Sequence, residues 1–204
     1  MGFNVILKTI IKKVVLVGVL VSSSLANEYF FDFVLGHSLN GVSYSYTRFY
    51  EAGDGEGHSS EGNVYKTGLR VGTSVEITDD FLIEPSLGWE DIGSFYGSMM
   101  NTYSLEVPIL YRYKNIKFGP LYRYNYLTDI VIRDYSNMVK VPDKFSQSLG
   151  LKAIVVTRGA DFIFSYEYML DAIYKDVNSE NSTVTTTELN LQGAYFSFGI
   201  RVKF

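Results

Sequence analysis

His37 and Ser38 are adjacent residues of the types that acyl transfer uses. A serine nucleophile needs a general base, and the base needs a third group, commonly an acid, that orients it. The segment His37-Ser38-Leu39-Asn40 offers no such acid. The sequence also has no Gly-x-Ser-x-Gly, phosphate-loop or His-Glu-x-x-His motif. We therefore expect no catalytic residues and no cofactor-binding residues.

The second histidine, His58, follows an acid-rich stretch. Residues 51–57 read Glu-Ala-Gly-Asp-Gly-Glu-Gly, and four acids fall between Glu51 and Glu61. The ligand spacing of a calcium-binding hand is missing. We expect a solvated loop without a metal site, with weak divalent-ion binding through Asp54 and Glu56 as the alternative. The absence of cysteine excludes disulfides, thiol catalysis and cysteine metal ligands.

The first 26 residues have the features of an export signal. Lys8, Lys12 and Lys13 precede an apolar run, and small residues at Ser24 and Ala26 suit cleavage after Ala26. This segment holds three of the 18 basic residues and none of the 22 acids, so residues 27–204 carry 15 basic and 22 acidic side chains, a net charge of −7. An acidic chain of this kind is a poor nucleic-acid binder, and we expect no such partner.

The remaining chain alternates apolar and polar residues with period two, which is typical of strands. Seven segments show this pattern, and no charge falls on their apolar faces. An eighth strand begins near Tyr29, and its phase slips after Asn40-Gly41, which indicates a bulge or bend. The seven segments are residues 65–77, 81–89, 103–113, 118–126, 145–155, 162–170 and 196–204.

The connections between these strands are of two kinds. Short turns are expected at residues 78–80, 114–115 and 158–160, and long polar loops at 51–62, 91–102, 130–143 and 172–187. Three short and four long connections between eight antiparallel strands place both ends of the barrel on the short-turn side.

The alternation fits a soluble barrel with its apolar face inward or a membrane barrel with that face outward. Two features favour the membrane barrel over a lipocalin-like one. The polar face is rich in Gly and Ser, as a narrow interior requires, and aromatic residues gather near both strand ends, as at two lipid interfaces. We predict one all-β domain at residues 27–204, an eight-stranded antiparallel up-and-down transmembrane β-barrel.

The final strand carries the most specific motif. Ser197, Gly199, Val202 and Phe204 fit a polar-x-Gly-x-x-hydrophobic-x-aromatic pattern, with Val202 where an aromatic is more usual. The chain thus resembles the small eight-stranded outer-membrane barrels of Gram-negative bacteria, of the outer-membrane protein A transmembrane-domain and opacity-protein type. That resemblance implies an outer-membrane location with both barrel termini periplasmic, and contact with the bilayer and lipopolysaccharide. It also implies that the barrel-assembly machinery reads the last strand.

Charged residues occur in the inward register with both signs, and buried charges must pair. We predict that Glu106 faces Arg123, and that Lys152 lies beside or diagonal to Glu167. The predicted interior charges are Asp32, Lys66, Arg70, Glu76, Glu84, Glu106, Arg112, Arg123, Lys152, Glu167 and Arg201.

Eight strands enclose a space that side chains can fill, so a plugged interior is expected. We predict a non-enzymatic barrel with a structural or surface role, such as envelope integrity or adhesion, through a surface ligand that the sequence does not identify. A narrow, porin-like channel for small solutes is the alternative. A lipid A-modifying enzyme is less favoured, because the barrels of that kind carry their His and Ser on a late strand, whereas His37 lies on the first.

Overall fold

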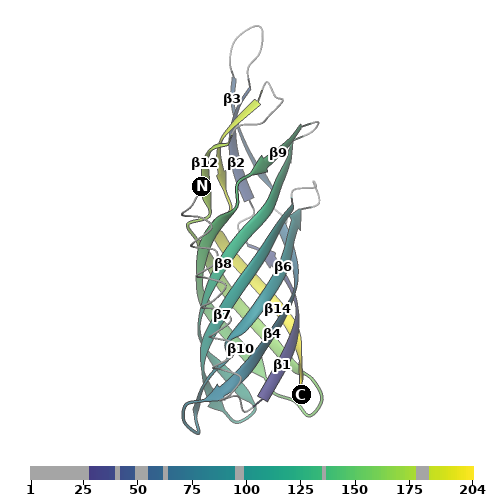
Figure 1. The fold of residues 1–204 in the computed structure, drawn as a ribbon, viewed down its shortest axis with the longest axis vertical. Helices are drawn as coiled ribbons and strands as arrows, with labels where there is room; N and C mark the ends of the chain where they lie inside the picture. The colour runs from purple at the N-terminus through teal and green to yellow at the C-terminus, as the bar shows by residue number, and fades with distance from the viewer. Residues whose placement is uncertain are drawn as a thin grey trace, which may run out of the picture.

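Eight strands close into an antiparallel ring in the computed structural model (Figure 1). The structure describes residues 28–39, 42–48, 55–61, 64–94, 99–134, 137–177 and 184–204, so the expected export signal lies outside it. Each strand pairs with the next, and the last returns to the first, which confirms the predicted all-β up-and-down barrel. In order around the ring the strands are β1 (Glu28–Ser38), β4 (Val64–Glu76), β6 (Ser86–Ser94), β7 (Met99–Tyr113), β8 (Ile116–Asp134), β10 (Lys144–Val155), β11 (Asp161–Leu170) and β14 (Gly193–Lys203).

The short connections all lie at one end of the ring, together with the start of β1 and the end of β14. Lys114 and Asn115 form a two-residue turn, which confirms the short turn predicted there, and Tyr113 pairs with Ile116. Lys114 has a φ of 54°, which is the left-handed conformation that tight hairpins need. At the same end, backbone amides of Tyr29 and Phe204 donate to each other's carbonyls at 3.3 and 3.0 Å, closing the ring.

The strand expected at 81–89 is interrupted rather than continuous. Its first part is β5 (Phe81–Ile83), and β6 starts after Pro85, which has no N–H to donate to a neighbouring strand. The Pro85 carbonyl still accepts from the Thr73 amide at 3.1 Å. Leu82 and Glu84 are both buried, so the inward register continues through the break.

A second sheet rises above part of the ring (Figure 1). It has the order β12 (Ile173–Val177), β13 (Val184–Asn190), β2 (Val42–Arg48) and β3 (Gly55–Glu61). These strands continue β11, β14, β1 and β4 respectively, and we call this sheet the extension. In addition, β9 (Asn137–Val141) pairs with the upper part of β8.

The extension and β9 correct three expectations from the sequence. Residues 51–62, 130–143 and 172–187 were expected to be loops, but each contains strand, namely β3, β9 with the end of β8, and β12 with the start of β13. The fourth long connection is also shorter than expected, since β6 runs to Ser94 and β7 starts at Met99. Strand pairing continues past the ring because the backbone N–H and C=O groups of these polar segments find hydrogen-bond partners in neighbouring strands.

Glycines allow neighbouring strands of the ring to approach each other closely. A Cβ added at Gly119 would lie 2.0 Å from the Ile109 carbonyl oxygen, and one at Gly150 would lie 2.1 Å from that of Tyr166. Only glycine permits such close backbone approach. No helix in the described residues is long and apolar enough to cross a membrane.

Candidate functional site

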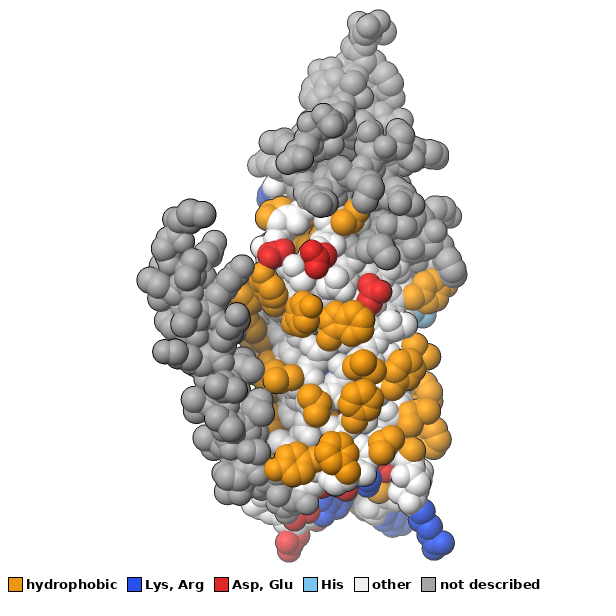
Figure 2. Space-filling model, turned by 45° about the vertical axis from the view of Figure 1, so that its right-hand side comes forward, with side chains coloured by type: hydrophobic (Ala, Val, Ile, Leu, Met, Phe, Trp, Pro, Cys, Tyr) orange, Lys and Arg blue, Asp and Glu red, His pale blue; other side chains and the backbone are white. Residues whose placement is uncertain are grey.

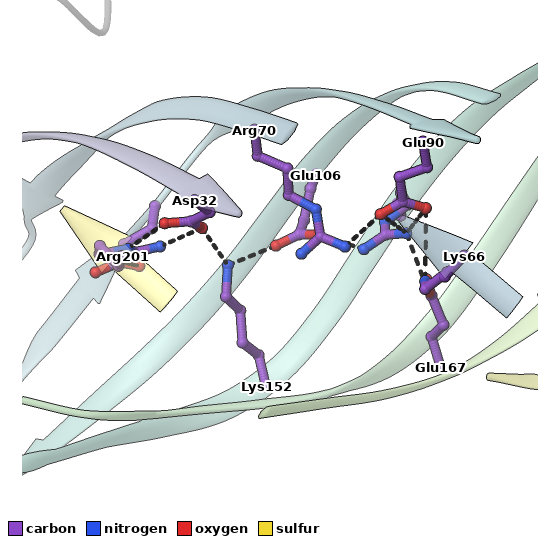
Figure 3. A network of polar contacts seen from close by, with 10 residues as sticks. Asp32, Lys66, Arg70, Glu90, Glu106, Lys152, Glu167 and Arg201 are labelled. Carbon is purple, nitrogen blue, oxygen red and sulfur yellow. Dashed lines mark hydrogen bonds and ion pairs between the residues drawn. The ribbon is translucent and has the colours of Figure 1, made fainter. Parts of the chain in front are cut away.

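The interior of the ring holds a layer of charged side chains (Figure 3). Within the described residues twelve charged side chains are buried, and the two signs balance, six against six. The acids are Asp32, Glu84, Glu90, Glu106, Asp161 and Glu167, and the bases are Lys66, Arg70, Lys117, Arg123, Lys152 and Arg201.

Glu106 lies at the centre of this layer. It faces Arg123 across the β7–β8 pair, and the Arg123 guanidinium donates to its carboxylate at 2.6 Å. The Lys152 amine lies 2.6 Å from the other oxygen, and Arg70 approaches at 3.0 Å. One carboxylate thus receives cations from three strands, which compensates its loss of water.

The upper half of the network continues from Arg123 toward the extension. Arg123 contacts Glu90 at 3.0 Å and Glu167 at 2.9 Å. Lys66 binds the same two acids, at 3.5 Å to Glu90 and 2.5 Å to Glu167. Arg70 also contacts Glu90, at 2.5 Å. These contacts join opposite walls of the ring, because Lys66 is on β4 and Glu167 on β11.

The lower half is built around Arg201. Its guanidinium makes a two-pronged contact with Asp32, at 2.7 and 2.9 Å, and reaches Glu84 at 2.6 Å. Lys117 also binds Glu84, at 3.0 Å. Lys152 joins the two halves, since its amine is 3.9 Å from Asp32 as well as close to Glu106 (Figure 3).

Apolar side chains pack across the interior at both ends of the charged layer. Next to the short turns, Leu82, Leu110, Ile154 and Ile163 form one buried cluster. A larger cluster lies where the ring meets the extension and includes Ala172, Tyr174 and Leu191 from the corners of that sheet. Burial, reinforced by the negative charge of Asp143, raises the pKa of the Tyr174 phenol. The other members of this larger cluster are Val64, Ile92, Met100, Leu127, Ile130, Val141, Met169 and Tyr195.

The structure places nine of the eleven predicted interior charges in the buried layer. Glu76 and Arg112 instead form a partly exposed ion pair of 2.6 Å at the short-turn rim, with 39% and 36% of their side chains accessible. Lys152 is diagonal to Glu167, because Gly150 is the residue opposite Glu167. The Lys152 amine bonds to Glu106 rather than to Glu167.

Three buried charges were not among the predicted residues, namely Glu90, Lys117 and Asp161. Each lies one residue beyond the limit set for its strand, but in the inward register of that strand. Glu90 follows Ser86 and Gly88, Lys117 precedes Gly119, and Asp161 precedes Ile163. Extending the alternation by one residue would have found all three.

The outer wall of the ring is apolar and exposed (Figure 2). Phe33, Leu151 and Phe198 are typical, with 45%, 62% and 37% of their surface accessible. Aromatic residues expected near the two ends also point outward, for example Phe81 and Phe118 near the short turns and Trp89 and Tyr103 near the extension. A soluble protein rarely exposes so large a contiguous apolar surface.

The wall separates the two residues considered for acyl transfer. His37 lies on the outside, where its ring is 6.3 Å from that of Tyr65, whereas Ser38 is buried inside. Successive strand residues point to opposite faces, so the two side chains cannot act as a pair. No cluster of metal-ligating side chains occurs among the residues whose placement is described. Asp54 lies outside these residues, and of the stretch around His58 only the backbone of β3 is described.

The apolar side chains of this barrel point outward and its charged side chains point inward, which is the reverse of a soluble barrel. This arrangement is typical of outer-membrane barrels. The sequence matches no protein-family model and no curated protein. Its structure is similar to the outer membrane protein OprG from Pseudomonas aeruginosa, with a TM-score of 0.50 and 12% identity over 88% of this chain and 96% of that one.

Two further solved structures match over most of their length. Neisserial surface protein A has a TM-score of 0.48 and 13% identity, covering 86% of this chain and 97% of that one. The Yersinia pestis outer membrane protein Ail has a TM-score of 0.44 and 15% identity, covering 87% and 99%. At these identities the likeness to OprG establishes the fold, which is that of a small outer-membrane β-barrel.

Proposed function

We propose that this protein is an integral outer-membrane β-barrel that presents its extension at the cell surface in a structural or adhesion-like role. The observation that carries the proposal is the exposed apolar wall around a buried, charge-balanced interior. In lipid, a closed ring satisfies its backbone groups internally, and outward apolar side chains meet acyl chains.

Cell fractionation combined with heat-modifiable gel mobility tests this location. The protein is expected in the outer-membrane fraction, and its unheated band should migrate differently from the boiled one because the folded barrel resists detergent. Recovery in the soluble periplasmic fraction without a heat-dependent shift would contradict the proposal. A protease added to intact cells should cut the extension only, because the short turns and both barrel termini would then face the periplasm.

A closed interior is part of the same proposal. The ion pair between Lys66 on β4 and Glu167 on β11 spans the interior, and apolar clusters pack at both ends of the charged layer. We therefore expect no unitary conductance steps from the purified barrel in planar lipid bilayers. Reproducible steps would instead favour the narrow solute channel.

We also propose that the barrel-assembly machinery recognises the last strand, β14. Ser197 and Gly199 face the interior, while Val202 and Phe204 project outward with 54% and 73% of their surface exposed. Phe204→Ser should lower the amount of folded protein in cells but leave refolding from urea into detergent unchanged. Equal losses in both would mean that Phe204 acts on stability alone. Contact with lipopolysaccharide, including any ion bridging through Asp54 and Glu56, also remains a proposal.

A further inference from the structure

Where side chains are described, the buried charges on each ring strand all have the same sign. Among the buried charges of the described residues, β1, β6 with the Glu84 before it, β7 and β11 contribute acids, while β4, β8, β10 and β14 contribute bases. We call each pair of neighbouring ring strands a seam, and six of the eight seams therefore join strands of opposite charge. The other two seams, β6–β7 and β8–β10, join strands of like charge. The acids of the first compensate the bases of the second, because Arg123 on β8 binds Glu90 and Glu106.

The alternation of apolar and polar residues cannot by itself fix how these strands align. A slip by one residue moves every charge to the outer wall, so the pattern excludes it. A slip by two residues keeps every side chain on its face. The uncharged inward positions are a mixture of Gly, Ser and apolar residues, and the outward ones are mostly apolar, so hydrophobic patterning alone does not exclude such a slip.

The ion pairs do oppose it. Two residues along a strand span about 7 Å, whereas the buried contacts between Asp32 and Arg201 measure 2.7 and 2.9 Å. A slip of two would separate the Asp32 carboxylate from the Arg201 guanidinium and break both contacts. Loss of these ion pairs therefore disfavours the two-residue slip, which the hydrophobic pattern alone would allow.

We propose that the interior charges set the register in which the ring closes, and that Asp32 and Arg201 fix the last seam, between β1 and β14. These residues are opposite one another in the β1–β14 pair and 169 positions apart in the chain. Their two-pronged geometry accepts one alignment only, because a planar guanidinium must face a planar carboxylate. The interior charges are thus a specificity device of the fold, and not only a filling for it.

Disulfide trapping reads this register directly, because the chain has no native cysteine. Phe33 lies opposite Ile200, and both point outward. A Phe33→Cys, Ile200→Cys barrel refolded into phosphatidylcholine vesicles and oxidised should cross-link in the folded band. Phe33→Cys with Phe198→Cys or with Val202→Cys reports a slip of two, since diagonal positions about 7–8 Å apart are too distant to bridge in the native register.

Neutralising the seam pair by Asp32→Asn with Arg201→Gln should raise the slipped cross-links about a hundredfold, the factor that corresponds to losing a buried pair. Neutralising the exposed rim pair by Glu76→Gln with Arg112→Gln is the matched control and should leave only the native cross-link. These two variants remove the same kind of charges from a buried and an exposed site.

A second variant keeps the composition unchanged and moves the acid by two inward positions. In Asp32→Val with Val34→Asp, the acid faces Arg201 only after a slip of two, so the Phe33→Cys, Val202→Cys cross-link should become the main product. Native cross-links alone from both variants would overturn the proposal. Failure of both to give any folded barrel would also overturn it, because the proposal requires that slipped rings form.

Discussion

The middle of the interior and its short-turn rim contain the same chemical contact in different surroundings. Glu106–Arg123 and Glu76–Arg112 are both carboxylate–guanidinium pairs of 2.6 Å between neighbouring or near strands. The first pair is 0% and 2% exposed, and the second 39% and 36%. Because the distances are equal, exposure to water decides how much each pair contributes to the free energy of unfolding. A buried charge that loses its partner has no solvent to replace it.

Removing the central cation should have the largest effect. Arg123→Gln leaves Glu90, Glu106 and Glu167 short of a partner. We expect the free energy of unfolding to fall by about 3–5 kcal/mol, as when a buried pair is broken. Urea titration of the refolded barrel, read by gel mobility, measures it. A loss below about 1 kcal/mol, within the range of exposed pairs, would show that the interior is solvated.

Placing a charge on the outer wall is the next test, because it creates a charge with neither water nor partner. Leu151 is outward and 62% exposed, in the middle part of β10. Leu151→Arg should cost about 2–4 kcal/mol in a bilayer. Leu151→Gln is the control for lost apolar contact and should cost clearly less. Equal stability of the Arg variant and the native protein in vesicles would place this wall in water.

The rim pair should give the smallest effect. Arg112→Gln is expected to lower the free energy of unfolding by less than about 1 kcal/mol, because exposed pairs contribute little and solvent screens them. The difference between variant and native protein should shrink further in high salt. The same urea titration at low and high salt measures it. A salt-independent loss as large as that of Arg123→Gln would contradict the contrast between the two regions.

Much of the ring could be predicted from sequence, because alternation is a local property. The face of each residue followed from its neighbours, and Glu106 was placed opposite Arg123 by counting from the Lys114-Asn115 turn. A similar count across the turn at 158–160 predicts Lys152 beside or diagonal to Glu167, but it does not predict the contact of Lys152 with Glu106, because β10 and β7 are not neighbouring strands. Such contacts depend on the stagger of all eight strands, which no single hairpin specifies.

The extension was missed for a different reason. Residues 55–61 read Gly-Glu-Gly-His-Ser-Ser-Glu, with no apolar face and two glycines, so composition predicts a loop. They form a strand because β2 lies beside them and supplies partners for their backbone groups. Corners such as Asp171, with a φ of 54°, mark where the ring strands turn into this sheet.

Fluorescence of the one tryptophan tests most directly that the apolar wall faces lipid. Trp89 points outward at the extension end of the wall, with 40% of its surface exposed. In vesicles whose acyl chains carry bromine, its emission should be strongly quenched, most by bromine close to the headgroups, while aqueous acrylamide should have little effect. Emission that ignores brominated lipid and is quenched by acrylamide would contradict the account.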